Sequence, residues 1–413
     1  MIGRRALAAL ALAVVMGAGA PAAAQPAAPS DDPLVVEVVT FGPGDHPFSR
    51  FGHNALRIRD RRTRSDVIYN FGTFSFAPDI VSQFLHKRLR YWLLQGSTAG
   101  VLASYKAENR SIEVQELNLW PAEKAELVRR LEVNARPENR EYRYDYFLDN
   151  CSTRVRDTLD VVLGGRVRAA AQQPARFTLR GQSLRMVASD LKLYLALLIV
   201  LGPPADRPID AWTEDFLPQM LQRTLRQVRR DDGGGTTRPL VERERTLFVA
   251  DRAPPPDAPP RRWPFFLLAG LLTAAGGYSL ARLGGRFWIA RALFGLSAAA
   301  VGLVSAGLGG FLIWAWVATP HLAVHRNQNI LLFAPFVGAF VVLGPGLALG
   351  KPGAIRAFSV VAAAAVACAV AACALKILPF AHQDNASLIL FMLPLWSGFF
   401  VGARALPNRR AAT

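Results

Sequence analysis

Cys151 is the one cysteine outside the apolar C-terminal region, and its neighbours favour a reactive thiol. It follows Asp149 and Asn150, which are good helix N-caps, and Val155 and Leu159 continue one apolar face of the helix that would start there. The amide dipoles of a helix N-terminus favour a thiolate, and the free N–H groups of the first turn can receive an oxyanion. The sequence therefore predicts a nucleophilic thiol; the alternative is a small buried core cysteine.

A nucleophilic cysteine needs a general base, and three histidines precede it in the chain. His46 lies in a turn-like segment and His86 beside basic residues, which is typical of a surface. His53 leads directly into an alternating strand, and the next strand carries Asn70, an amide that can orient an imidazole. We therefore predict Cys151, His53 and Asn70 as nucleophile, base and orienting residue.

These residues fall in a region, up to about residue 230, with the mixed pattern of an α+β domain. Helical windows alternate with strand-like runs at residues 34–41, 54–59, 66–76 and 111–119. The apolar run 193–201 is much shorter than the ~20 residues that cross a bilayer. We therefore expect that run to be a buried core helix of the same domain.

The segments that flank this domain differ from it in composition. A basic start, an apolar run and three alanines predict a signal peptide at residues 1–24, with an uncleaved signal anchor as the alternative. The predicted exported domain spans residues 25–230. A glycine triplet and a proline-rich stretch then predict a linker at residues 231–262.

Residues 263–404 have the composition of an integral membrane domain. Five apolar spans are near the length of a membrane-crossing helix, at residues 264–281, 292–319, 330–350, 358–378 and 388–401. Basic residues at alternate ends place the tail, residues 405–413, in the cytoplasm and the N-terminal domain outside. Residues 263–413 hold 10 basic and 1 acidic side chains, which is about half of the net charge of +17. We attribute this excess to basic residues that orient the helices in the membrane. No nucleic-acid partner is expected.

Two loops of the membrane domain, residues 320–329 and 381–386, are unusually polar and share the predicted outer face. They predict a polar pocket for a lipid headgroup or a substrate amine. The alternative is that amides simply favour turns. The residues concerned are His321, Asn327, Asn329, His382 and Asn385.

Several short motifs occur in an order that resembles a known family. They lie at residues 51–54, 69–72 and 149–153, with further similarity at 201–218 and in the two polar loops. Together they resemble the Lnb-type lipoprotein N-acyltransferases, whose exported domain is a branch of the papain-like NlpC superfamily in circularly permuted order. In that order the histidine strand precedes the cysteine helix, as it does here. The resemblance extends from about residue 35 to residue 401.

The resemblance implies an acyltransferase of the inner membrane with its catalytic domain in the periplasm. Cys151 would take an acyl chain from a membrane phospholipid as a thioester, with His53 as base. The α-amino group of a lipidated cysteine in an apolipoprotein would then accept the chain. Tyr69 and Asn150 are expected at the substrate site together with the polar residues of the membrane loops. Neither a cofactor nor a metal is expected.

Two other functions are compatible with the same residues. A Cys–His pair on a papain-like scaffold also cleaves peptides, so a membrane-anchored cysteine amidase or peptidase of cell-wall peptides is one alternative. A non-catalytic module that binds envelope components is the other. The polar membrane loops favour acyl transfer, because peptide hydrolysis needs no polar cluster at the membrane.

Overall fold

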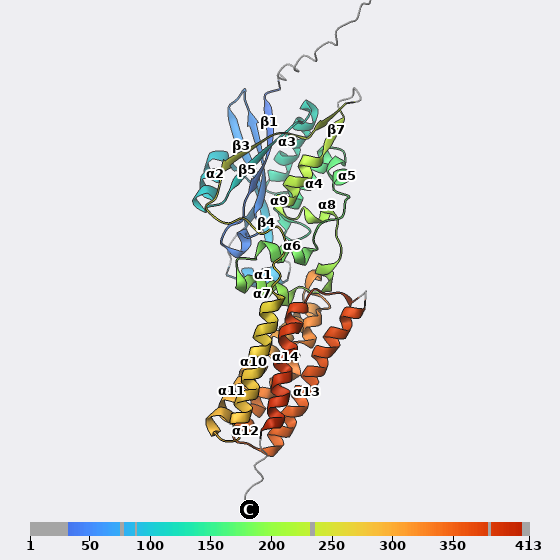
Figure 1. Ribbon diagram of the computed structural model, residues 1–413. Coiled ribbons are helices and arrows are strands. Elements are labelled where there is room, and N and C mark those ends of the chain that lie inside the picture. Colours follow the sequence, from blue (N-terminus) through green and yellow to red (C-terminus); the bar gives the residue numbers. More distant parts are fainter. Residues whose placement is uncertain (1–31, 75–77, 87–88, 232–235, 379–380, 407–413) are drawn as a thin grey trace, which may run out of the picture. The chain divides into compact units, whose positions relative to one another are not determined.

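A computed structural model describes residues 32–74, 78–86, 89–231, 236–378 and 381–406 (Figure 1). The predicted signal peptide and residues 407–413 of the predicted tail lie outside the described residues. The described residues confirm the α+β class, because a sheet-rich N-terminal region is followed by an all-helical C-terminal region.

A seven-stranded antiparallel sheet in the order β6-β4-β3-β2-β1-β5-β9 forms the centre of the N-terminal region. The four predicted strands are confirmed to within two residues at each end. The strands are β1 (Leu34–Phe41), β2 (His53–Asp60), β3 (Ser65–Phe74), β4 (Arg90–Ser97), β5 (Ile112–Leu117), β6 (Glu141–Arg143) and β9 (Val241–Phe248). A separate two-stranded sheet pairs β7 (Arg229–Asp231) with β8 (Thr237–Pro239).

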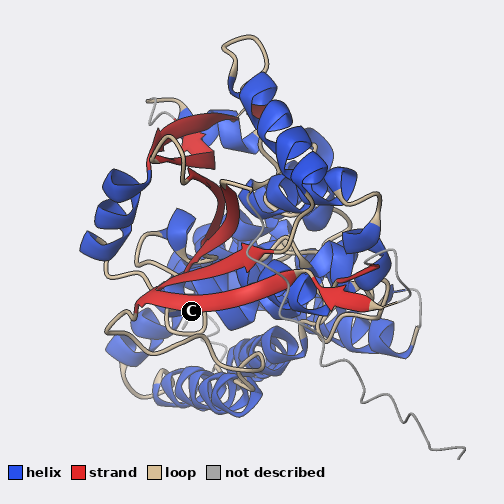
Figure 2. Ribbon diagram, turned by 90° about the horizontal axis from the view of Figure 1, so that it is seen from above, coloured by secondary structure: helices blue, strands red, loops and turns tan. Residues whose placement is uncertain are grey.

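Helices cover both faces of the large sheet (Figures 1 and 2). Val36 and Val38 of β1 belong to the apolar cluster on one face, and Val39 and Phe41 to the cluster on the other. This alternation follows from the two-residue repeat of a strand. The first face packs against α3 (Pro121–Ala135), α4 (Cys151–Val162) and α9 (Pro218–Gln227), and the second against α2 (Thr98–Ala107). Shorter helices are α1 (Ile80–Leu85), α5 (Arg166–Ala170), α6 (Leu179–Met186) and α8 (Ala211–Glu214).

The predicted linker contains a strand. β9 pairs with β5 and adds an edge to the sheet, although it lies within residues 231–262. Its charged residues, Glu242 to Arg245, are mostly exposed, as is usual for an edge strand. Because these four consecutive residues are charged, the segment lacks the alternation of apolar and polar residues that would identify a strand. The domain boundary at residue 230 stays a prediction, but the sheet continues to Phe248.

The helix predicted over residues 193–201 forms, as α7 (Leu191–Val200), but it is not a core helix of the sheet domain. Its buried residues, Tyr194 and Leu198, belong to the apolar cluster of the C-terminal helices. Leu191 remains exposed. The run is apolar on all sides because it lies against the membrane helices, which a count of apolar residues alone does not reveal.

Four C-terminal helices are long and apolar enough to cross a membrane, and they lie alongside one another (Figure 1). They are α10 (Trp263–Leu283), α11 (Trp288–Ala318), α13 (Pro352–Ala374) and α14 (Ala386–Ala405). The predicted third span is broken, because residues 322–331 and Pro335–Ala348 form a pair bent by 56°. Pro335 lacks an N–H for a continuous helix across this bend. The second piece ends in α12 (Ala339–Ala348), so the spans number five only if the bent pair is counted as one.

The predicted orientation can be tested at Gly353, an exposed residue in the first turn of α13 where an added side chain meets open space. A cysteine placed there, in a chain lacking its own three thiols, is expected to resist a membrane-impermeant maleimide in spheroplasts, because the basic loop before α13 is assigned to the cytoplasm. An Asp384→Cys variant, in the exposed loop before α14, is expected to react. The opposite labelling pattern would show that the helices have the reverse orientation in the membrane.

Candidate active site

Cys151 is the first residue of α4, as predicted, and Asn150 is its N-cap. The Asn150 side-chain oxygen accepts hydrogen bonds from the backbone N–H groups of Ser152 and Thr153, at 2.8 and 3.0 Å. Thr153 completes the capping box, since its hydroxyl accepts from the Asn150 N–H at 2.8 Å. The thiol therefore sits in the first turn of a well-capped helix.

The other end of the Asn150 amide anchors α4 to the surrounding loops. Its nitrogen donates to the carbonyls of Tyr146 and Phe216, both at 3.0 Å. Both side-chain donors and the side-chain oxygen are thus used within the protein. In the structure Asn150 joins the start of α4 to the surrounding loops, and the substrate contact expected from the sequence stays a prediction.

His53 begins β2, is 7% exposed, and has its Nε2 2.6 Å from Oδ1 of Asn70. The same oxygen accepts the backbone N–H of Gly72 at 2.9 Å, which identifies it as the oxygen end of the amide. Nε2 of His53 must then carry the proton and donate it to Asn70, so that Nδ1 is the basic nitrogen of the neutral ring. The structure thus brings His53 and Asn70 together; their catalytic roles stay a prediction.

Two glycines make room for the imidazole. A Cβ at Gly72 would overlap Cε1 of His53 and lie 3.0 Å from its Nδ1. Gly52 has φ +82°, in the left-handed region, and a Cβ there would lie 2.9 Å from the carbonyl oxygen of Phe41. Both positions exclude larger residues, because the ring and the strand start occupy the space of a side chain.

An aromatic pair supports His53 from the second face of the sheet. The rings of Phe41 and Tyr105 stack with centroids 3.7 Å apart, and each centroid lies 6.0 Å from that of His53. Tyr105 also hydrogen-bonds Asn70. Tyr105 was not predicted, since no spacing in the sequence relates the end of α2 to the start of β2.

The thiol and the imidazole are both neutral at physiological pH in this structure. Burial raises the pKa of Cys151, although the N–H groups of Asn54, Ser152 and Cys151 itself and the charge of Arg110 all act to lower it. Burial, together with the Arg110 charge, lowers the pKa of His53 to about 3. The helix N-terminus thus lowers the pKa of Cys151, as predicted. Desolvation raises the same pKa by more, so the thiol stays protonated and the expected resting thiolate is not favoured.

A cavity of about 610 Å³ contains both groups and extends to the membrane helices. Its walls are mostly apolar and aromatic. Cys151, His53 and Gly72 lie on the catalytic side, and the wall continues with residues of α7 and α11, namely Leu193, Leu197, Phe311, Ala315 and Thr319. The contribution of α11 was not predicted, because an apolar helix does not reveal in its sequence which of its faces lines a site.

The predicted substrate residues are only partly brought to this cavity. His321 lines it, and its ring stacks with that of Tyr146 at 5.7 Å. Tyr69 lies in the core between the sheet and α4 and does not line the cavity. His382 is exposed.

Three further predicted residues, Asn327, Asn329 and Asn385, form a polar cap on the C-terminus of α7. The Asn327 amide donates to the carbonyls of Ile199 and Val200 at 2.8 Å. The Asn329 side-chain nitrogen donates to the carbonyl oxygen of Ile199 at 2.8 Å, and its side-chain oxygen accepts a hydrogen bond from the Asn385 amide at 2.6 Å. These side chains satisfy helix carbonyls that have no partner within the helix. They attach the polar loops to α7, and their predicted part in a substrate pocket stays a prediction.

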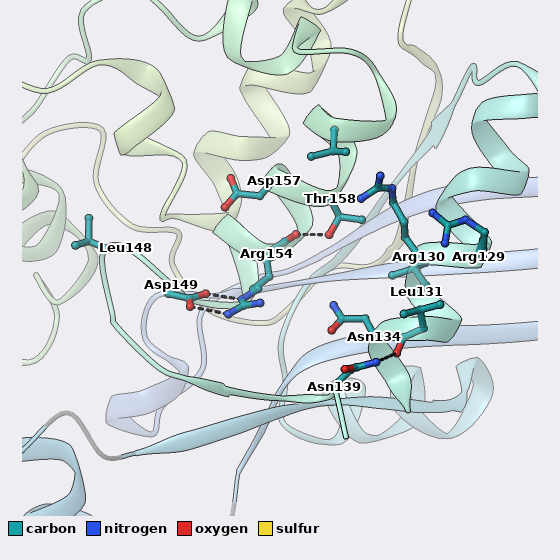
Figure 3. A pocket seen from close by; sticks show the side chains of 12 residues that line it. Arg129, Arg130, Leu131, Asn134, Asn139, Leu148, Asp149, Arg154, Asp157 and Thr158 are labelled. Atoms are coloured by element: carbon teal, nitrogen blue, oxygen red, sulfur yellow. Dashed lines mark hydrogen bonds and ion pairs between the residues drawn. The ribbon is translucent and has the colours of Figure 1, made fainter. Parts of the chain in front are cut away.

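A second hollow, of about 730 Å³, lies over α3 and α4 (Figure 3). It is lined by charged side chains such as Arg129 and by the ion pair between Arg154 and Asp149, with N–O distances of 2.5 and 2.6 Å. Its lining includes neither a histidine nor a cysteine among the described residues, so it offers no thiol and no imidazole base. Within the described part of the chain, no three His, Cys, Asp or Glu side chains gather as metal ligands would.

The neutral resting pair predicts a specific pH dependence. Alkylation of Cys151 by iodoacetamide is expected to be slower at pH 7 than that of an exposed cysteine and to rise about tenfold per pH unit towards a midpoint above the usual cysteine pKa, because only the thiolate reacts. His53 should add no inflection near pH 6.5, since its pKa is about 3. A midpoint below pH 8 would show a thiolate-imidazolium pair instead. The tyrosines facing the thiol are kept neutral by burial and should not interfere: Tyr91, Tyr105, Tyr142 and Tyr144.

Comparison with known families gives one match. Residues 27–187, which include β1 to β6 and α4 with His53 and Cys151, match the family described as Lnb N-terminal periplasmic domain. No curated protein and no solved structure matches the chain. The helical C-terminal region fits the membrane part that the sequence motifs indicate. Residues 27–187 of this chain therefore belong to the Lnb N-terminal periplasmic domain family.

Proposed function

We propose that this chain is a lipoprotein N-acyltransferase that moves an acyl chain from a phospholipid, through a thioester on Cys151, to the α-amino group of a lipidated cysteine. The observation that carries the proposal is the shared cavity. The predicted nucleophile and base lie in the same mostly apolar hollow as side chains of α11, a helix long enough to cross a membrane.

The apolar wall suits an acyl chain. Leu193 and Leu197 of α7 and Phe311 and Ala315 of α11 offer a surface on which each buried CH₂ group gains about 0.8 kcal/mol. Contact with α11 lets a chain reach Cys151 directly from the bilayer. A peptidase acting on cell-wall peptides has no use for such a wall.

In the first half-reaction, Sγ of Cys151 attacks the ester carbonyl carbon of the donor while Nδ1 of His53 takes the thiol proton. The C–S bond forms, the ester C–O bond breaks, and the lysophospholipid leaves as an alcohol with the proton from His53. The N–H groups of Asn54 and Cys151, which act on the sulfur in the resting site, can stabilise the oxyanion.

In the second half-reaction, a neutral amine attacks the thioester carbon. The C–N bond forms, the C–S bond breaks, and the amine proton passes through His53 to the sulfur. Asn70 holds the resting ring in the tautomer with a basic Nδ1 and keeps it correctly directed in both halves. Burial of the site excludes water, so the thioester is protected from hydrolysis until the amine arrives.

The same geometry suits the proposed acceptor. A lipidated cysteine remains in the bilayer with its amino group near the surface, as does the phospholipid. We therefore assign the chain to the inner membrane, with the catalytic domain in the periplasm. Confinement of enzyme and both substrates to one membrane raises their effective concentration.

The proposal is tested by intact-mass analysis of the purified protein mixed with phospholipid. An adduct with the mass of one acyl chain is expected on the native chain and not on Cys151→Ala. Addition of a synthetic peptide with an N-terminal diacylglyceryl cysteine should discharge the adduct and give an N-acylated peptide. Cleavage of cell-wall peptides without a lipid adduct would identify the peptidase alternative.

A further inference from the structure

Arg110 is a cation in the wall of the cavity that the reaction described above does not use. It lies between α2 and β5 and is 5% exposed. Its Nε donates to the carbonyl oxygen of Gly42 at 2.8 Å, and its Nη1 lies 3.3 Å from a carboxylate oxygen of Glu108. The guanidinium carbon lies 4.5 Å from the ring centre of Tyr105, the residue that stacks on His53.

One nitrogen of this guanidinium, Nη2, is buried and has no hydrogen-bond partner among the described residues. A buried charged donor without a partner is destabilising, so a ligand that accepts a hydrogen bond from Nη2 would be favoured here. Glu108 compensates the charge only in part, because its side chain is 53% exposed. Glu108 lines the cavity as well, so the guanidinium and a solvent-screened carboxylate lie side by side at this point of its wall.

The surrounding backbone holds Arg110 firmly. Asn109 has φ +51°, in the left-handed region, and turns the chain immediately before it. Gly44 lies close on the other side, since a Cβ there would approach Cδ of Arg110 to 3.2 Å. The charge acts on both Cys151 and His53, lowering the pKa of each. The guanidinium thus lies within electrostatic range of the reacting atoms.

We propose that Arg110 binds the phosphate group of the acyl donor and makes the site selective for phosphate-bearing lipids over neutral glycerolipids. A guanidinium suits this ligand, because its N–H groups match the oxygens of a phosphate. In a phospholipid the phosphate is only a few bonds from the ester that Cys151 attacks. The inference rests on the proposed acyl transfer and specifies its donor.

The test measures the rate of adduct formation on Cys151 with two donors in the same detergent micelles, phosphatidylglycerol and a diacylglycerol with identical chains. Arg110→Gln is expected to lower the phospholipid-to-diacylglycerol rate ratio by about 10- to 100-fold, the usual effect of one hydrogen bond to a charged group. Arg110→Lys should restore part of the ratio, since it keeps the charge.

The matched control is Arg252→Gln. Arg252 contacts the carbonyl oxygens of Glu108 and Asn109 but does not line the cavity, so its loss should leave the ratio unchanged. An equal fall with both donors in Arg110→Gln would show that Arg110 serves only the fold or the pKa of the catalytic pair, and would overturn the inference.

Inorganic phosphate separates the two possible sources of the ligand. Inhibition of the native chain by millimolar phosphate that is lost in Arg110→Gln, with no change in the phospholipid-to-diacylglycerol ratio, would assign the site to free phosphate and not to a lipid. If the native chain formed an adduct with neither donor, the proposed acyl transfer would fail, and the inference with it. Adducts with both donors and an unaltered ratio in Arg110→Gln would reject the inference alone.

Discussion

Replacement of His53 by alanine is expected to slow acylation of Cys151 by about two to four orders of magnitude, the range typical of a lost general base. The effect should be large because burial keeps the thiol neutral, so that almost no thiolate exists without a base. Cys151→Ala should abolish the adduct entirely. Rapid-quench mass analysis of the acyl-enzyme measures both effects.

Three matched variants test whether His53, and not another residue, is the general base. Asn70→Ala is expected to cost about tenfold, since it removes the orientation of the ring but leaves its basic nitrogen. His46 lines the same cavity, but His46→Ala should act nearly as the native chain, because His46 is exposed and its Nδ1 caps a short 3₁₀ helix. His86→Ala should do the same, since its Nδ1 lies 2.8 Å from the Ser82 carbonyl on an exposed helix. Loss of activity in His46→Ala with retention in His53→Ala would transfer the role of base to His46.

Local sequence signals correctly predicted the helix that starts at Cys151 and the strand beside His53. The N-cap at Asn150 and the alternation that begins after His53 are patterns of neighbouring residues, so they can be read without knowing the fold. The pairing of His53 with Asn70 was predictable for a related reason. The two strands are adjacent in the chain, and their register, with Leu56 opposite Tyr69, brings the start of β2 beside Asn70 and Gly72.

Contacts between distant segments could not be predicted in this way. Tyr105 stacks on His53, with Arg110 beside it, because β5 pairs with β1, whose last residue lies opposite His53, and nothing in their local sequence indicates it. The pKa of Cys151 depends on how completely the site is buried, which is a property of the whole cavity wall. The edge strand β9 was not predicted, because its run of charged residues lacks the alternation of apolar and polar residues typical of a strand.

The polar membrane loops illustrate the same limit. Their amides were correctly identified as unusual, but their partners are the carbonyls at the end of α7, a helix more than 100 positions earlier in the chain. Gly202, which follows α7, donates its N–H to the carbonyl of Ala323 at 2.7 Å. This capping fixes α7 against the start of the broken span. The cavity wall that α7 and α11 share is therefore built by contacts between the catalytic region and the membrane helices.

Ala315 provides the most direct test of that shared wall. It is 3% exposed and lines the cavity from α11. Ala315→Phe is expected to slow adduct formation from a long-chain phospholipid by about 10- to 100-fold, because overpacking a filled site costs roughly 1–3 kcal/mol. A soluble short-chain ester, which need not extend along α11, should lose far less.

Val317→Phe is the matched control, since Val317 lies on the same helix, is 74% exposed and does not line the cavity. It should leave both donors unaffected. Equal rates for Ala315→Phe and Val317→Phe with the long-chain donor would mean that the acyl chain does not pass along α11. The helices would then serve only to anchor the catalytic domain, and the peptidase alternative would gain support.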